Sequence, residues 1–371
     1  MSGLYIHIPF CASRCIYCGF YSTTLAKEQD AYVDALCHEM ALRKNETREL
    51  STVYLGGGTP SLLSTDNLRK IFRNISDVFS PSWEKMEVTI ECNPDDITPE
   101  FCSLLRDLPI NRVSMGAQTF SDERLRFLHR RHNAAEVPLA IECLRAHGIV
   151  NISIDLMFAF PDETLEEWSH DIDAALQLRP EHISAYSLQY EEDTPLYRLL
   201  EKGAVKEADD ELYRQMYSLL CKRLTDAGYE HYEISNFALP HFRSRHNSSY
   251  WHDIPYIGLG ASAHSYSGTT RSWNVSDLRA YIQSVGSGSR PCETEIITPQ
   301  IHYDDMVMTA LRTHEGISLP SLHEPFKSYL LRAVQPYLRD GELNITDGHL
   351  ALTRDGIFIS DMIMSDLMWT E

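Results

Sequence analysis

The sequence predicts an α/β fold, in which a partial (β/α) barrel of about six units is followed by a smaller, winged-helix-like α+β domain. Three observations predict it. Apolar, strand-like runs alternate with stretches of helical apolar spacing over the first two-thirds of the chain. Polar or glycine-rich motifs follow almost every strand-like run, and a barrel builds its site at such strand ends. Near the C-terminus, helical stretches precede the turn signal Asp347-Gly348.

The alternation predicts each barrel element in turn. The expected strands cover residues 4–10, 51–61, 86–94, 111–120, 151–161 and 182–191. The expected helices cover residues 31–43, 65–79, 99–108, 122–128, 134–147, 165–178 and 209–227. Ser64 or Thr65 is the expected N-cap of the second helix. Strands that alternate with helices pair in parallel through right-handed crossovers, so we expect their carboxyl ends to meet at one rim.

Three regions follow from this pattern. We expect the barrel at 1–238, a connecting segment at 239–297 and a C-terminal domain at 298–371. The connecting segment is rich in histidine, aromatic residues and glycine, with little helical period. In the C-terminal region, 342–346 and 349–353 alternate as hairpin strands. A packing appendage of the barrel is the alternative interpretation of this last region.

Composition and charge exclude several classes of protein. The chain has 371 residues, 43% of them apolar, with 33 basic and 53 acidic side chains and a net charge of −20. This balance argues against a nucleic-acid surface and against a polybasic membrane patch. Neither a signal peptide nor an apolar run of about 20 residues is recognisable, so we expect a cytoplasmic protein. Six of the nine cysteines are scattered singly, which indicates a reducing compartment: Cys37, Cys92, Cys102, Cys143, Cys221 and Cys292.

The other three cysteines, Cys11, Cys15 and Cys18, lie close together in YIHIPFCASRCIYCGF. Three thiolates are one fewer than a closed tetrahedral zinc site needs, and one fewer than normally saturate an iron–sulfur cube. A cluster held by three cysteines leaves one iron open to a ligand from outside the chain. With Tyr17 before the last cysteine, this stretch resembles the radical S-adenosylmethionine (SAM) superfamily, in which the amino acid end of SAM is that ligand.

Polar residues at the later strand ends suit the rest of SAM. The run Gly56-Gly57-Gly58-Thr59 is neither a dinucleotide fingerprint nor a P-loop, but its glycines let the backbone approach a ligand closely. Carboxylates and amides bind ribose hydroxyls, and an arginine pairs bidentately with a carboxylate. The residues we expect to line a SAM site in this way are Glu91, Gln118, Arg130 and Asp155.

Five motifs together resemble the oxygen-independent coproporphyrinogen III oxidase family: the cysteine stretch, GGGTP, ECNP, the Gln118–Arg130 pair and IDLM. The resemblance covers essentially the whole chain. That family includes the HemN oxidases, which decarboxylate a porphyrinogen in porphyrin biosynthesis, and the HemW haem chaperones. One departure lies at 159–164, where AFPDET replaces the usual GLPGQT, so the contact made by the usual glycine is not expected here.

The resemblance implies a [4Fe-4S] cluster and SAM as cofactors. Cys11, Cys15 and Cys18 are the implied cluster ligands. The implied SAM contacts are Tyr5, Gly57, Gly58, Thr59, Glu91, Gln118, Arg130 and Asp155, with Tyr17 beside them.

Residues 246–251, HNSSYW, carry a second kind of chemistry. A neutral His246 imidazole can ligate haem iron, and Tyr250 and Trp251 offer flat apolar surface for a porphyrin. A packed loop is the ordinary structural explanation of such a cluster. The stretch matches the HNxxYW motif associated with haem binding in the chaperone branch. The resemblance therefore implies haem contacts from His246, Asn247, Tyr250 and Trp251, with His264 and Tyr266 as secondary candidates.

Two further features favour the chaperone branch. Phe20 stands where the oxidases carry another cysteine, and only four residues precede Tyr5, so we expect no oxidase-type N-terminal extension. We therefore predict a haem chaperone that delivers haem to a haem protein such as a respiratory oxidase. The first alternative is an oxygen-independent coproporphyrinogen III oxidase, and the second is a radical SAM enzyme with an unrelated substrate. Whether the chain is an enzyme stays open at this point.

Overall fold

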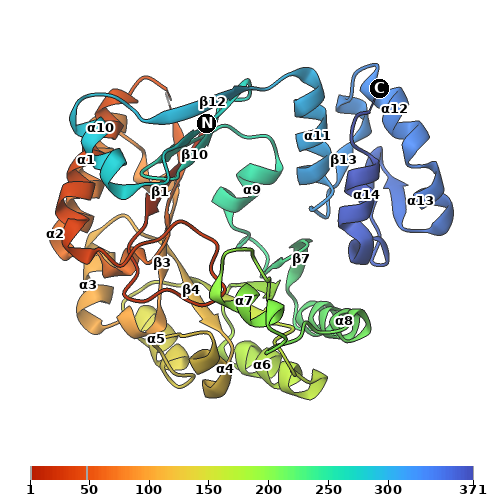
Figure 1. Ribbon diagram of the computed structural model, residues 1–371, viewed down its shortest axis with the longest axis horizontal. Helices are drawn as coiled ribbons and strands as arrows, with labels where there is room; N and C mark the ends of the chain where they lie inside the picture. The colour runs from red at the N-terminus through yellow and green to blue at the C-terminus, as the bar shows by residue number, and fades with distance from the viewer. Residues whose placement is uncertain (1, 47–48, 371) are drawn as a thin grey trace.

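Six parallel strands, hydrogen-bonded in their order along the chain, form the middle of a twelve-stranded sheet. The computed structural model describes residues 2–46 and 49–370 (Figure 1). The strands are β1 (Ser2–Ile8), β2 (Leu50–Gly57), β3 (Glu87–Cys92), β4 (Arg112–Gln118), β5 (Asn151–Phe158) and β6 (His182–Ser187). The helices that follow them are α1 (Gln29–Leu42), α2 (Thr65–Phe79), α3 (Pro99–Asp107), α4 (Asp122–Phe127), α5 (Glu136–Ala146), α6 (Leu165–Leu178), α7 (Pro195–Glu201) and α8 (Asp210–Asp226). The predicted α/β class and the partial barrel are confirmed.

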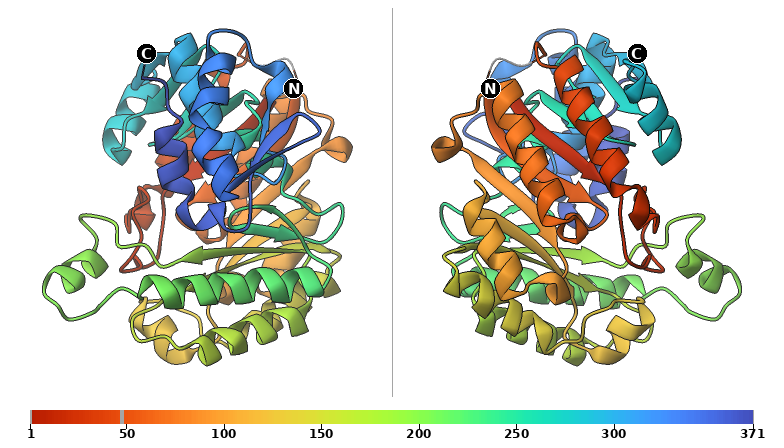
Figure 2. Two further views of the ribbon diagram at one scale, coloured as in Figure 1. Left: turned by 90° about the vertical axis from the view of Figure 1, so that its right-hand side faces the viewer. Right: turned by 90° about the vertical axis from the view of Figure 1, so that its left-hand side faces the viewer.

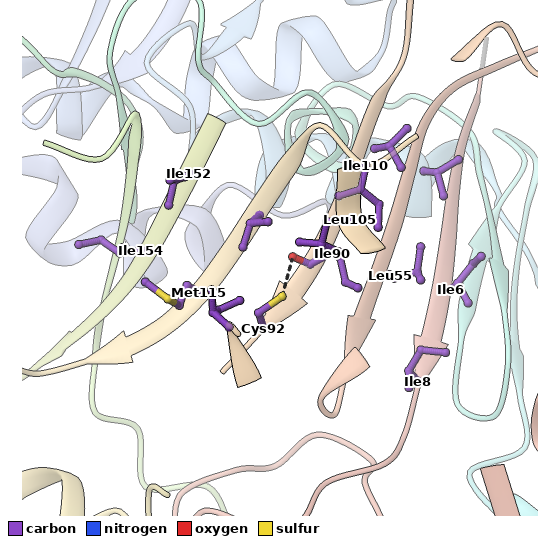
Figure 3. Packing of buried hydrophobic residues seen from close by; sticks show 14 of the residues in the cluster. Ile6, Ile8, Leu55, Ile90, Cys92, Leu105, Ile110, Met115, Ile152 and Ile154 are labelled. Atoms are coloured by element: carbon purple, nitrogen blue, oxygen red, sulfur yellow. Dashed lines mark hydrogen bonds between the residues drawn. The ribbon is translucent and has the colours of Figure 1, made fainter. Parts of the chain in front are cut away.

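Alternate side chains of these strands face the outer helices and form the main hydrophobic core. Figure 3 shows Ile6 and Ile8 of β1, Leu55 of β2 and Ile90 of β3 on this face, together with Leu105 of α3. Because successive side chains of a strand point to opposite sides, every second residue of β1–β6 is left for the inside of the barrel. The start of α2 agrees with the prediction, because the side chain of Ser64, one of the two predicted N-caps, accepts a hydrogen bond from Asn67 N.

The inner face of the barrel, which we call the lumen, is polar. It carries tyrosine and histidine on β1, carboxylates on β3 and β5, and an arginine on β4. The residues concerned include Tyr5, His7, Tyr54, Glu87, Glu91, Arg112, Ser114, Asp155 and Ser184. The strict alternation of apolar and polar residues therefore separates a packing face from a face that is free to carry chemistry.

The segment 239–297 extends the sheet, which the sequence did not predict. It contains α9 (Arg245–Trp251), β9 (Tyr256–Leu259), β10 (His264–Tyr266), β11 (Thr270–Asn274), α10 (Leu278–Gly286) and β12 (Cys292–Ile296). Strand β9 pairs in parallel with β1, and β10–β12 continue the sheet as antiparallel strands. At the other edge, β8 (Asn236–Ala238) pairs with β6 and β7 (Glu230–Glu233) with β8. These strands and α9 are too short to leave a clear period in the sequence.

The C-terminal region has a hydrophobic cluster of its own, formed around Val307, Leu330 and Leu350. It contains α11 (Pro299–Ala310), β13 (Ile317–Ser318), α12 (Phe326–Ala333), α13 (Gln335–Asp340), β14 (Leu343–Thr346), β15 (His349–Leu352) and α14 (Ser360–Asp366). Strands β14 and β15 form the hairpin expected from Asp347-Gly348, and both turn residues have positive φ. Figure 2 shows these helices on one side of the sheet, with α1 and α2 on the opposite side. No helix in residues 2–46 and 49–370 is long and apolar enough to cross a membrane.

A buried carboxylate holds the sheet extension to the barrel. Glu39 of α1 is fully buried and accepts hydrogen bonds from Gly260 N at 2.8 Å, Asn274 Nδ2 at 2.8 Å and the Tyr281 hydroxyl at 2.6 Å. Arg43, the C-cap of α1, lies 3.5 Å away as a buried counter-ion, and Arg290 lies at the same distance. Because α9 precedes β9 directly, this network also limits where the C-terminal end of α9 can lie relative to the barrel.

We predict that Glu39→Ala lowers the free energy of unfolding by about 3–5 kcal/mol, because it breaks a buried ion pair and leaves the buried Gly260 N–H and Tyr281 hydroxyl without this acceptor. The matched control is Glu46→Ala, which removes the exposed partner of the same Arg43 and is expected to cost only about 0–1 kcal/mol. Urea unfolding of the two variants measures the difference. Equal losses would contradict the role given to Glu39.

Candidate functional site

The cysteine loop, residues 9–25, leaves β1 at the rim where the carboxyl ends of the parallel strands meet (dark red in Figure 1). Backbone hydrogen bonds close it on itself: Cys11 N donates to Thr23 O at 2.9 Å, and Thr23 N donates to Pro9 O at 2.7 Å. Ile16 N donates to Leu128 O at 3.3 Å and ties the middle of the loop to the end of α4. Cys11, Cys15 and Cys18 are all partly buried and free.

Two side chains, Thr59 after β2 and Arg130 after α4, point donors at these sulfurs. Arg130 Nη1 lies 3.5 Å from Cys15 Sγ, and Thr59 Oγ1 lies 3.7 Å from Cys11 Sγ. Burial raises the pKa of the Cys11 and Cys18 thiols, so metal binding here would release protons. Hydrogen bonds to cysteine sulfurs are among the features that tune an iron–sulfur cluster, and the loop therefore fits one.

The glycine run packs the end of β2 against the start of the cysteine loop. Gly58 N donates to Ile8 O at 2.8 Å, and Thr59 N donates to Phe10 O at 2.7 Å. Gly57 has a φ of +108°, and a Cβ added there would lie 2.4 Å from the His7 ring. The N–H groups of this run are therefore used within the protein, and its carbonyl oxygens are what it can offer a ligand.

Glu91 is a half-buried carboxylate in the lumen, next to this run. Its Oε1 accepts from the Tyr54 hydroxyl at 2.7 Å, and its Oε2 accepts from Gly57 N at 3.0 Å. Burial raises the pKa of Glu91 to about 7, although both hydrogen bonds oppose the shift. On β5, burial also raises the pKa of Asp155, which accepts from Ser114 Oγ at 3.5 Å. The lumen thus holds two carboxylates that a bound cation or hydroxyl donor would stabilise in their charged forms.

Arg130 links the cysteine loop to β3 and β4. Its Nη2 donates to Asn93 Oδ1 at 2.7 Å and to Gly116 O at 2.8 Å. Its Nε is buried and has no partner among the described residues. A buried donor without a partner is rare, and a ligand carboxylate would satisfy this one. Gln118, at a register shift between β4 and β5, has a φ of +66° and folds its side chain over Gly116.

Two tyrosines complete the predicted SAM set. Burial raises the pKa of the Tyr17 hydroxyl. The charges of Arg130, Cys15 and Asp155 also influence this pKa, which indicates that Tyr17 lies near these three residues. Tyr5 lies deeper in the lumen, where its hydroxyl is 2.9 Å from His7 Nδ1. The structure therefore brings the predicted SAM residues to the rim or the lumen of one barrel, and their binding roles stay predictions.

His246 lies inside the lumen on α9. Its Nδ1 is 2.7 Å from Thr52 Oγ1, and its Nε2 is 2.9 Å from the Tyr250 hydroxyl. Its ring stacks on Tyr54 at a centroid distance of 5.1 Å. Burial, and then the charge of Arg112, lowers the pKa of His246 to about 3, so the imidazole is neutral. Both ring nitrogens are occupied within the protein, and iron ligation by His246 would require one of these hydrogen bonds to break.

The other predicted haem residues face different surroundings. Asn247 N donates to Ser244 Oγ, the N-cap of α9, at 3.3 Å. Tyr250 and Trp251 line a cavity that the C-terminal region closes, as does Tyr266. His264 is exposed and stacks on Trp273 at 6.0 Å. The structure therefore separates His246 from the cavity by the width of the Tyr250 side chain.

Two features of the structure were not predicted from the sequence. Tyr54 was not singled out, although it alternates with Val53 and Leu55 in a strand that leads to the glycine run. Cys102 and Cys143, predicted to be isolated, have sulfurs 3.3 Å apart, and with His147 they form a group with potential ligand atoms within 4.8 Å of one another. The four-residue spacing of Cys143 and His147 was the available signal, but the contact with Cys102 depends on how α3 packs against α5.

Comparison with known proteins identifies the class. Residues 5–175 match the model of the radical SAM superfamily, and residues 297–359 match the HemN C-terminal domain. The structure of coproporphyrinogen III oxidase (HemN) from Escherichia coli has the same fold, with a TM-score of 0.84 at 22% identity over 98% of this chain and 89% of that one. This is a radical SAM protein, and membership of that superfamily implies a [4Fe-4S] cluster and SAM.

Relatives that are similar in sequence show to which family within this superfamily the chain belongs. Heme chaperone HemW of Bacillus subtilis is 35% identical over 98% of both chains. Heme chaperone HemW of Mycobacterium tuberculosis H37Rv is 32% identical over 99% of this chain and 94% of the relative, and that of Escherichia coli K12 is 35% identical over 71% and 69%. The chain belongs to the HemW family.

We predict that Gly57→Ala lowers the iron and sulfide bound per chain after anaerobic reconstitution, because the new Cβ displaces the His7 ring beneath the cysteine loop. The matched control is Gly268→Ala, which has a φ of +89° but no atom within 4 Å of the new Cβ. Both variants pay about 1–2 kcal/mol for the left-handed backbone. If both retain the same cluster content, the close approach at Gly57 does not position the loop.

We predict that Glu91→Gln weakens the pH dependence of stability. Folded Glu91 keeps its proton up to about pH 7, whereas the unfolded chain releases it near the ordinary value of 4.5. Folding therefore binds a proton in this window, and the free energy of unfolding falls as pH rises through it. Urea midpoints at about pH 5 and about pH 8 should differ less in Glu91→Gln than in the wild type. Glu84→Gln, at an exposed position, serves as the control and should leave the wild-type difference unchanged.

Proposed function

We propose that this protein is a haem chaperone that binds a [4Fe-4S] cluster, SAM and haem, and passes the haem to a haem protein. The relatives named heme chaperone HemW, which match the chain over nearly its whole length, support the proposal. The observation that carries it is the position of HNSSYW. His246 stacks on Tyr54, which donates to Glu91 beside the predicted SAM site, while Tyr250 connects His246 to the cavity. One short helix thus joins the predicted SAM and haem regions.

The chain's own residues have distinct tasks in this proposal. Cys11, Cys15 and Cys18 would hold the cluster, and Arg130 would donate to the Cys15 sulfur and, through its unsatisfied Nε, to the SAM carboxylate. Carbonyl oxygens of the glycine run accept from the SAM amino group. The remaining contacts fall to Tyr5, Gly57, Gly58, Thr59, Glu91, Gln118 and Asp155, with Tyr17 beside them. When bound, the cluster and SAM supply one-electron redox chemistry.

The haem contacts we propose come from α9, where Tyr250 and Trp251 offer flat apolar surface to a porphyrin. His246 holds the helix in the lumen through Thr52, and Asn247 N donates to the N-cap Ser244. The proposed recipient is a haem protein such as a respiratory oxidase. A cytoplasmic location stays a prediction.

Haemin titration under anaerobic conditions tests the proposal. We expect the reconstituted wild type to bind haemin with a defined stoichiometry and a shifted Soret band, and to restore the spectrum of an apo b-type haem protein on mixing. A variant with serine at positions 11, 15 and 18 shows whether transfer needs the cluster. Absence of stable haemin binding by the wild type would refute the proposal.

A second candidate function is that of an oxygen-independent coproporphyrinogen III oxidase. The observation that favours it is the convergence of Glu91, Arg130 and Asp155 beside the cysteine loop, which provides a full set of polar groups for SAM. An anaerobic assay with SAM, a reductant and coproporphyrinogen III decides between the two. Protoporphyrinogen formed over many turnovers would establish the oxidase, and haem transfer without such turnover would favour the chaperone.

A further inference from the structure

A cavity of about 830 Å³ lies between α9, the sheet extension and the C-terminal region. In Figure 1, α9 stands between the barrel strands and α11. Residues of α9 and α11 are both part of the cavity lining. Its volume falls in the range of about 300–1,000 Å³ that is typical of small-molecule sites. Its apolar walls include Tyr250, Trp251 and Ile254 on one side and Met306, Leu322 and Phe326 on the other. A flat apolar ligand therefore suits it.

Three imidazoles line the cavity, and His252 is the one arranged as a metal ligand. His252 follows HNSSYW directly and is exposed. Its Nδ1 lies 2.8 Å from Ser248 O, and because a carbonyl only accepts, the ring proton is on Nδ1. The lone pair is then on Nε2, which has no hydrogen-bond partner among the described residues. A metal-ligating histidine commonly donates its other N–H to a carbonyl in this way, which fixes its tautomer and orientation.

The other histidines are less suited to ligate iron. His302 Nε2 lies 2.9 Å from Asp253 Oδ2, and Asp253 also accepts from the Tyr266 hydroxyl. His323 lies on the exposed segment before α12, and no hydrogen bond within the described residues orients its ring. His246 lies outside the cavity lining, with both ring nitrogens hydrogen-bonded in the lumen.

The arginine of the cavity lining can pair with a haem propionate. Arg271 is the arginine of the lining, and it pairs with Asp305 and with Glu295, the latter at 3.4 Å. A haem propionate is a carboxylate and can take the place of either partner. The remaining acidic groups, Asp253 and Glu324, lie with Asp305 in the lining and would face the iron side or the solvent.

We propose that this cavity is the haem site and that His252 Nε2, rather than His246, is the axial ligand of the iron. The inference rests on the proposed function, since it assumes that the protein binds haem. In this arrangement the Tyr250 side chain lies between the haem and His246. A change in the position or charge of Glu91 or Tyr54 can then affect the haem through His246 and Tyr250, without direct contact.

The first experiment compares haemin binding by the wild type, His252→Ala and the control His170→Ala. His170 of α6 is exposed like His252 but lies outside the cavity lining. We expect His252→Ala to weaken binding about tenfold or more, to shift the Soret band and to regain the wild-type band with added imidazole, whereas His170→Ala changes nothing. Wild-type affinity and Soret position in His252→Ala would overturn the assignment. Failure of the wild type to bind would instead refute the proposed function.

A second pair of variants tests the cavity itself. Thr309 lines it from α11, and Met308 is exposed next to it and lies outside the lining. Thr309→Trp is expected to fill the cavity and to weaken haemin binding about tenfold, while Met308→Trp retains wild-type binding. Equal binding by both variants would place the haem elsewhere and overturn the proposal.

Discussion

In six parallel strands, apolar side chains that face the helices alternate strictly with polar side chains that face the lumen, and the rest of this structure depends on this constraint. Apolar residues such as Ile6, Leu55 and Ile90 face the helices, so their neighbours Tyr5, Tyr54 and Glu91 must face the lumen. A shift of one residue in any strand would exchange the two faces, and burial of the apolar face forbids it. The polar lumen and the common rim of strand ends both follow from this constraint.

Helix α9 converts the lumen into a connected polar network. Glu87, at the start of β3, accepts hydrogen bonds from the backbone N–H groups of Arg245 and His246, both at 2.9 Å, and so fixes the first turn of α9 inside the barrel. At its other end, Trp251 lies under the Arg312 guanidinium of the C-terminal region at 5.2 Å. The helix therefore contacts the barrel and the C-terminal region at once, which suits a part that relays a change from one to the other.

Much of the barrel was predictable because it rests on local and periodic signals. The cysteine spacing, the glycine run and the strand ends at Glu91 and Asp155 all lie in or beside long apolar runs. The sheet extension was not predictable, because β9 reaches β1 across some 250 residues of sequence and depends on the buried Glu39 network. The contact between Cys102 and Cys143 was not predictable for the same reason, because it depends on how two helices pack against each other.

The sequence by itself determined the α/β class, the family and the set of residues predicted to bind a cluster and SAM, because these depend on residue type and spacing. Only the tertiary structure decided what surrounds each side chain. HNSSYW supplies a histidine and two aromatic residues in any fold. Its docking on Glu87 is what turns His246 into the lumen and leaves His252 at the cavity with a free Nε2. A ring nitrogen is available to iron only where the surrounding packing leaves it without another partner.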